Sequence, residues 1–179
     1  MIIYTIPLLF GLYLNKKSTE KIRNKIVLLF KNSYDSLPDI IHDNFPKINA
    51  LIPDIFLLIC IFALALKWPL LLNAEHNTLC LGICTILRSY IVQITIIPTC
   101  ISKLKPTTNI YINRLISIFD LMFSGHTLFF IAIGNMLNNW LIPILGPFLL
   151  IIARQHYTID VFMSGLVYNY VYYKTKYLF

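Results

Sequence analysis

Two histidines and one aspartate of this chain stand in patterns that suit phosphoryl transfer. His126 lies in the run Phe-Ser-Gly-His-Thr (residues 123–127), and His156 precedes Asp160 by four positions. If a helix begins beside His156, that spacing puts both side chains on one face. The carboxylate can then accept the proton of one imidazole nitrogen while the other nitrogen attacks phosphorus. The sequence therefore predicts His156 as a nucleophile that is oriented by Asp160.

Other residues suit the remaining parts of such a reaction. His126 can protonate a leaving oxygen and later deprotonate an acceptor hydroxyl, because the unperturbed pKa of histidine permits both steps near neutral pH. Gly125 lets the backbone approach a phosphate, whose charge the amides at the start of the following helix would stabilise. Arg88 or Arg154 would supply a cation that spreads charge in the transition state.

Composition indicates where this chemistry takes place. Among 179 residues, 58% are hydrophobic and only 13% are charged, which is too little polar surface for a soluble globule. We therefore expect an all-α, polytopic membrane helix bundle. The net charge of +7 accompanies no basic-aromatic nucleic-acid module, so the expected partners are anionic lipid headgroups and not nucleic acid.

The cysteines do not form a zinc-binding set, because no second pair or nearby histidine completes the ligands. We expect all four to be small apolar packing residues. They are Cys60, Cys80, Cys84 and Cys100. No metal and no cofactor is expected.

Apolar runs predict the helices that must position the polar residues. Residues 52–72 and 78–98 are each long enough to cross a bilayer. The second run contains Arg88, which needs a polar neighbour at membrane depth. Three shorter helices are predicted at residues 127–137, 141–152 and 160–173. Together with the N-terminal segment, these runs indicate about six transmembrane helices, or five if that segment does not span.

The N-terminal region differs from the rest of the chain. Residues 1–14 are apolar but shorter than the roughly 20 residues that a crossing needs, so whether they span stays open. Residues 15–47 are polar and basic, with apolar positions near helical spacing that predict an interfacial amphipathic helix. We divide the chain into this apolar segment and basic interfacial region (1–36) and a catalytic membrane domain (37–179).

The order of the helices predicts where the histidines meet. The helix that begins near His126 leaves one membrane face, the next helix returns, and the helix that contains Asp160 leaves again. His126 and His156 are therefore expected at the same face. Arg88 lies in the second half of a helix that runs towards that face and is expected to reach the same site.

These residues resemble two motifs of the sphingomyelin synthase family, a branch of the type 2 phosphatidic acid phosphatase superfamily. Ser-Gly-His-Thr (residues 124–127), with Asp120 four residues before the serine, is similar to the third family motif. His-Tyr-Thr-Ile-Asp-Val (residues 156–161) is similar to the fourth.

The first two family motifs have weaker counterparts. Leu-Pro-Asp (residues 37–39) resembles the first motif, and Arg88 followed by Thr-Ile-Ile-Pro (residues 95–98) resembles the second. The four matches lie in family order across residues 37–161.

The resemblance implies a six-helix membrane enzyme that moves a phospho-headgroup from a glycerophospholipid to ceramide and releases diacylglycerol. The headgroup would be phosphocholine, phosphoethanolamine or phosphoinositol. By the same resemblance, His156 would be the nucleophile, Asp160 its partner and His126 the acid and base, and the substrate-binding residues would be Arg88, Asp120, Ser124, Gly125, Arg154 and Tyr157. The implied location is the endoplasmic reticulum, Golgi or plasma membrane, and a homo-oligomer is compatible with it.

The chain departs from the family pattern around the third and fourth motifs. Ile118-Phe119 replaces a frequent Cys-Gly, and Arg154-Gln155 replaces the His-Asp that animal members tend to carry. A lipid phosphate phosphatase or phospholipase C-like hydrolase is the main alternative function, and a non-catalytic lipid-binding scaffold is the second. The family orientation puts the site at the lumenal or outer face, whereas seven Lys and Arg in residues 15–47 favour the cytosolic face.

The remaining polar residues have plain structural interpretations. Asp39 and Asp54 are expected to stabilise helix starts, and Asp120 suits a helix cap as well as a site carboxylate. His42 and His76 are expected to be solvated loop residues.

Overall fold

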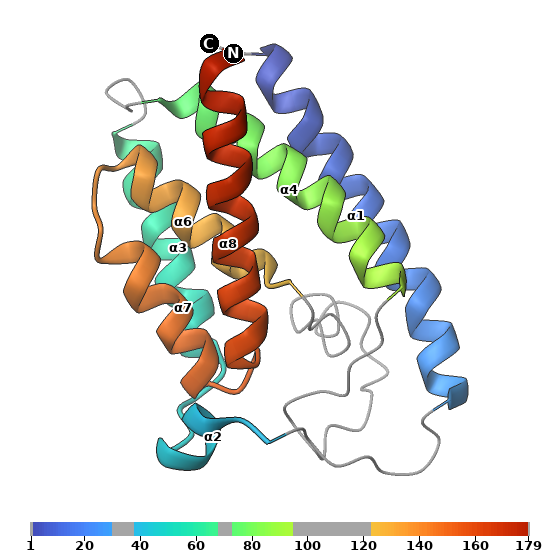
Figure 1. Cartoon of the computed structure of the whole chain (residues 1–179). Helices are drawn as coiled ribbons and strands as arrows, with labels where there is room; N and C mark the ends of the chain where they lie inside the picture. Colours follow the sequence, from blue (N-terminus) through green and yellow to red (C-terminus); the bar gives the residue numbers. More distant parts are fainter. Residues whose placement is uncertain (1, 30–37, 68–72, 95–122, 179) are drawn as a thin grey trace.

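The computed structural model describes residues 2–29, 38–67, 73–94 and 123–178 (Figure 1). Within these ranges the regular elements are helices, which confirms the all-α class. They are α1 (Ile2–Leu29), α2 (Ile40–Asn44), α3 (Leu51–Leu66), α4 (Ala74–Ile94), α6 (Gly125–Met136), α7 (Ile142–Ile152), α8 (Thr158–Thr175) and the 3-10 turn η2 (Lys176–Leu178).

Helix α1 joins two parts of the chain that the sequence pattern predicts to be separate. It continues through Asn15-Lys16-Lys17, where we had placed the end of the apolar segment. Lysine is a good helix former, and both lysine side chains are exposed, so nothing at this point ends the helix. The basic residues therefore extend the first helix and do not start a second one.

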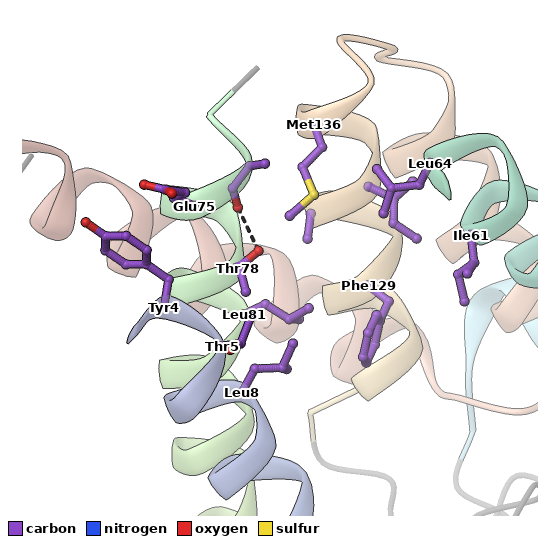
Figure 2. A pocket seen from close by; sticks show the side chains of 13 residues that line it. Tyr4, Thr5, Leu8, Ile61, Leu64, Glu75, Thr78, Leu81, Phe129 and Met136 are labelled. Atoms are coloured by element: carbon purple, nitrogen blue, oxygen red, sulfur yellow. Dashed lines mark hydrogen bonds between the residues drawn. The ribbon is translucent and has the colours of Figure 1, made fainter. Parts of the chain in front are cut away.

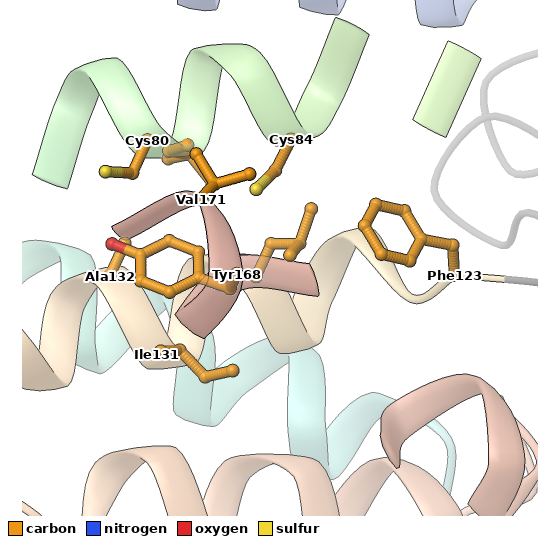
Figure 3. Close-up of a cluster of buried hydrophobic side chains, with 9 residues drawn as sticks. Cys80, Cys84, Phe123, Ile131, Ala132, Tyr168 and Val171 are labelled. Carbon is orange, nitrogen blue, oxygen red and sulfur yellow. The ribbon is translucent and has the colours of Figure 1, made fainter. Parts of the chain in front are cut away.

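Helix α6 lies at the centre of the bundle and packs against α3, α4, α7 and α8. One buried cluster lies between α4, α6 and α8 and includes Cys80, Cys84, Leu128 and Tyr168 (Figure 3). A second cluster lies between α6, α3 and α7. Cys60 belongs to this second cluster, so the prediction that the cysteines are packing residues is confirmed for these three, and Cys100 lies outside the described residues.

Helix α1 packs along α4 through small residues. A Cβ atom on Gly82 would lie 2.6 Å from the backbone nitrogen of Leu8 and 2.8 Å from the carbonyl carbon of Pro7. The Ser89 hydroxyl also contacts the carbonyl oxygen of Gly11 at 3.3 Å. Small residues let two backbones approach this closely, as they do between membrane helices.

The length and composition of the described helices support the predicted membrane association. Among the described helices, α4 is long and apolar enough to cross a bilayer, whereas α3 and α7 are apolar but shorter. The outer side of α3 carries large exposed apolar side chains, among them Leu58, Phe62 and Leu66. The number of membrane crossings stays a prediction.

The close approach of α1 to α4 predicts the effect of adding one methyl group. We expect Gly82→Ala to lower the free energy of unfolding by about 1–3 kcal/mol, because the new Cβ meets backbone that cannot move aside easily. The matched control is Gly165→Ala in α8, where the nearest atom to a new Cβ is Ile131 Cδ1 at 3.9 Å. That variant should be neutral or up to about 1 kcal/mol more stable. Equal melting temperatures for the two variants would contradict the described packing.

Candidate active site

The two histidines meet at one end of the bundle. His126 is the second residue of α6, and His156 lies two residues before α8. In Figure 1, α6 begins near the middle of the view and α8 begins lower down, and both run towards the upper end. The centroids of the two imidazole rings are 6.4 Å apart. The predicted proximity of His126 and His156 is therefore confirmed, while their position at one membrane face stays a prediction.

The segment that carries His156 is held by Asp39. The Asp39 carboxylate caps α2 by accepting hydrogen bonds from the backbone N–H groups of Ile41 and His42, at 3.0 and 3.3 Å. It also accepts bonds from the backbone N–H and the hydroxyl of Thr158, at 2.7 and 2.8 Å. The predicted helix-start role of Asp39 is confirmed, and the same carboxylate also serves the first residue of α8.

The position of His42 differs from the prediction. We had expected a solvated side chain, but His42 lies in α2 and is buried. Its Nε2 lies 3.1 Å from the carbonyl oxygen of His156, which accepts the hydrogen bond, and its ring lies 5.6 Å from that of Tyr157. Helix α2 folds back over the segment before α8, which removes His42 from solvent. His42 therefore supports the backbone of the proposed nucleophile.

His76 is also not a loop residue. It lies in α4, with its Nε2 at 2.8 Å from the hydroxyl oxygen of Thr175 in α8. The ring packs on Tyr172, with centroids 4.4 Å apart. The helix begins earlier than we had predicted, at Ala74, so it includes this histidine.

Asp160 lies beside His156 but has a second role. Asp160 is fully buried, and one carboxylate oxygen is 3.9 Å from His156 Nδ1. That distance suits an ion pair but is too long for a hydrogen bond. The same oxygen accepts a hydrogen bond from the backbone N–H of Tyr157 at 3.0 Å, which caps the first turn of α8. The predicted neighbours are therefore together, while the predicted hydrogen bond between them is not formed.

The carboxylate nearest to His126 was missed as a site residue. Asp54 Oδ1 lies 3.4 Å from His126 Nε2. Asp54 is in the first turn of α3, which agrees with the expected helix-start position. Gln155 donates to the carbonyl oxygen of Ala50 at 2.7 Å and contacts Asp54 at 3.4 Å. A carboxylate within an apolar run was the only sequence signal of this role.

Arg88 reaches the site from α4. Its buried side chain donates from Nε to the carbonyl oxygen of Phe123 at 2.8 Å and from Nη1 to the side-chain oxygen of Asn15. A Cβ on Gly125 would lie 3.3 Å from Arg88 Nε, so the glycine lets the guanidinium pack against the start of α6. Phe123 has a φ of 104°, a strained value of the kind that clusters at functional sites.

The other predicted substrate-binding residues mainly support the two helix starts. Ser124 is fully buried and caps α6 by accepting a bond from the backbone N–H of Thr127 at 3.2 Å. Tyr157 is buried at the start of α8. Arg154, at a φ of 57°, donates to the carbonyl oxygen of His42 at 3.0 Å. Asp120 lies outside the described residues.

The segments that carry His126 and His156 contain several buried polar atoms without a hydrogen-bond partner. Most buried polar atoms in proteins are hydrogen-bonded, so each exception calls for a reason. Within the described parts of the chain, five buried side-chain atoms have no protein partner: Thr127 Oγ1, Arg154 Nε, Gln155 Oε1, His156 Nδ1 and Asp160 Oδ1. All five belong to the segments that carry His126 and His156.

Comparison with protein-family models, curated proteins and solved structures finds no match to this chain. The chemistry of the site therefore rests on the chain's own residues and their geometry.

The hydrogen bonds of Asp39 predict how stability depends on pH. Burial by itself would raise the pKa of this carboxyl, but the bonds from Thr158 and His42 outweigh it and hold the pKa below 3.8. A carboxyl with a lowered pKa in the folded state stabilises that state above its unfolded pKa and loses the effect as pH falls through the folded pKa.

We therefore expect Asp39→Asn to lower the melting temperature at neutral pH. The difference from the wild-type protein should shrink as the pH falls below 3.8. Asp43→Asn is the control, because Asp43 is an exposed carboxylate in the same helix. A difference that does not change with pH would show that the charge of Asp39 is unimportant for stability.

Proposed function

We propose that this protein is a polytopic membrane enzyme that transfers a phospho-headgroup from a glycerophospholipid to ceramide and releases diacylglycerol. The observation that carries the proposal is the pair of imidazoles 6.4 Å apart, each beside a carboxylate. The guanidinium of Arg88 lies at the start of the helix that carries His126. The resemblance to the sphingomyelin synthase family supports the same reaction.

In the first half-reaction, His156 is the nucleophile. Its Nδ1 faces Asp160, so Nε2 is the nitrogen that attacks the phosphorus of the donor lipid. An N–P bond forms as the P–O bond to diacylglycerol breaks, and protonated His126 gives its proton to the departing oxygen. The nearby carboxylate of Asp160 stabilises the positive charge that the phosphorylated imidazole carries.

In the second half-reaction, the acceptor hydroxyl of ceramide attacks the phosphorus. His126, now neutral, takes the hydroxyl proton as the new P–O bond forms and the N–P bond breaks. Productive contacts between reacting atoms are about 3 Å long, so a phosphoryl group fits between two rings at the observed separation. Arg88 and the amides at the start of α6 favour the negative charge on the phosphoryl oxygens.

The apolar surface of the bundle supports a lipid as the substrate. Exposed apolar side chains on α3 suit contact with acyl chains, and α4 is long enough to cross the bilayer. His126 keeps 31% of its side chain exposed, whereas His156 keeps 5%. A hydroxyl that the membrane delivers can therefore approach from the side of His126, while the nucleophile stays shielded from water.

The first test follows the labelled headgroup. Purified protein in detergent micelles is given phosphatidylcholine, phosphatidylethanolamine or phosphatidylinositol, each with and without ceramide. We expect a ceramide-dependent phospho-headgroup lipid together with diacylglycerol, and no turnover by a folded His156→Ala variant. His76→Ala is the matched control, because this histidine lies in α4 and contacts α8 instead of the site. Label that appears only in a water-soluble phospho-alcohol, at a rate indifferent to ceramide, would indicate a phospholipase C-like hydrolase instead.

We expect different effects from removing the charge of Asp54 and that of Asp160. Asp54→Asn removes the charge beside His126 and should lower the rate by at least tenfold, a part of the roughly 10²–10⁴-fold effect of general acid–base catalysis. Asp160→Asn keeps an oxygen that can cap α8, so the melting temperature should hold while the rate falls by at least about tenfold, because the negative charge beside His156 is lost. Asp43→Asn serves as the control for both. An unchanged rate in either variant would restrict that carboxylate to a structural role.

A further inference from the structure

An apolar cavity lies between α1, α3, α4 and α6. Its volume is about 260 Å³. Figure 2 shows side chains from the four helices around one space, with Leu8 and Leu81 on one side and Ile61 and Leu64 on the other. The walls are almost entirely hydrocarbon, so the cavity suits an apolar ligand.

The cavity lies on the same face of α6 as His126. Phe129, Ile133 and Met136 line it, and they follow His126 by three, seven and ten positions. These spacings put all four side chains on one side of the helix. At 1.5 Å per residue, the wall from Phe129 to Met136 is roughly 10 Å long. It begins about one helical turn beyond the histidine.

The far end of the cavity is formed by the start of α4 and the end of α6. Arg88 of α4 packs near Gly125 of α6, and Ala74 lies fourteen positions before Arg88, about 21 Å along the helix. Met136 lies eleven positions after Gly125, in the same direction. Ala74 and Met136 both line the cavity, so they lie in the part of it that is farthest from the histidines.

Resting on the proposed function, we propose that this cavity holds one hydrocarbon chain of the lipid whose phosphate lies between His126 and His156. The side chains at Ala74, Thr78 and Met136 then limit the length of the chain that fits. Helix α1 is part of the binding site, because Leu8 supplies one wall. The hydrocarbon chain follows α6 from the polar helix start into the apolar interior. The phosphate then lies at the polar end of the site and the hydrocarbon at the apolar end.

The test uses diacylglycerol, because every candidate phospholipid donor contains a diacylglycerol moiety. The probe carries a photoreactive diazirine in the outer half of a palmitoyl chain and is used in detergent micelles. We expect its crosslinks in the peptides that contain Met136 and Ala74, and we expect unlabelled dipalmitoyl lipid to displace the probe better than dioctanoyl lipid. Crosslinks confined to the exposed side of α3, at Leu58 or Phe62, would overturn the proposal.

Larger side chains at the far end of the cavity should weaken the binding of long hydrocarbon chains. We expect Ala74→Leu to reduce palmitoyl labelling about tenfold, because added bulk in a hydrophobic pocket excludes chain atoms. Binding of the dioctanoyl competitor should change by less than about twofold, since it need not reach that end. Thr78→Leu is a second filling variant, and Ala65→Leu on the exposed side of α3 is the matched control. Labelling that both filling variants leave unchanged, with melting temperatures retained, would also overturn the proposal.

Labelling does not depend on turnover, so the two proposals fail separately. If no lipid product forms with any headgroup while the labelling pattern holds, the cavity proposal stands and the transferase proposal fails. If a ceramide-dependent product forms while the probe never reaches the cavity peptides, the transferase stands and the cavity proposal fails.

Discussion

The Asp39 carboxylate joins the starts of two helices, and the geometry of the candidate site depends on that junction. It caps α2 and binds both the backbone and the hydroxyl of Thr158 at the start of α8. Helix α2 in turn brings His42 to the carbonyl oxygen of His156. The first N–H groups of a helix have no partner within the helix, so they need other acceptors when they are buried. A single carboxylate meets that need for two helices and thereby holds the segment that carries His156 in place.

The site combines this fixed support with features that disfavour folding. Phe123 adopts a strained φ, Arg88 is a buried cation, and five buried polar atoms near the histidines have no protein partner. Each feature costs free energy in the folded state, so the surrounding packing must offset it. The two core clusters on either side of α6 and the close contact of α1 with α4 provide buried contacts that can offset this cost. The stable part of the bundle thus holds a polar site that would not form alone.

Helix α6 connects the chemistry to the apolar interior. It begins at Gly125 beside Arg88, carries His126 in its first turn, and then contributes to both core clusters and to one wall of the cavity. A helix start offers unbonded N–H groups and a positive dipole end, whereas the later turns offer only side chains. One helix can therefore face a charged group at its start and a hydrocarbon group along its length.

The sequence by itself determined the helical class and the approximate positions of most helices, because its apolar runs are longer than strands usually are. It also determined that His126 and His156 share one end, because three successive antiparallel helices leave no alternative. The sequence did not show that α1 continues through Asn15, since local propensity allowed either outcome. Only the tertiary structure decided that Asp54 lies beside His126 and that His42 is buried against His156. Asp54 and His126 are far apart in the chain, and they meet because α3 packs against α6, which no local pattern encodes.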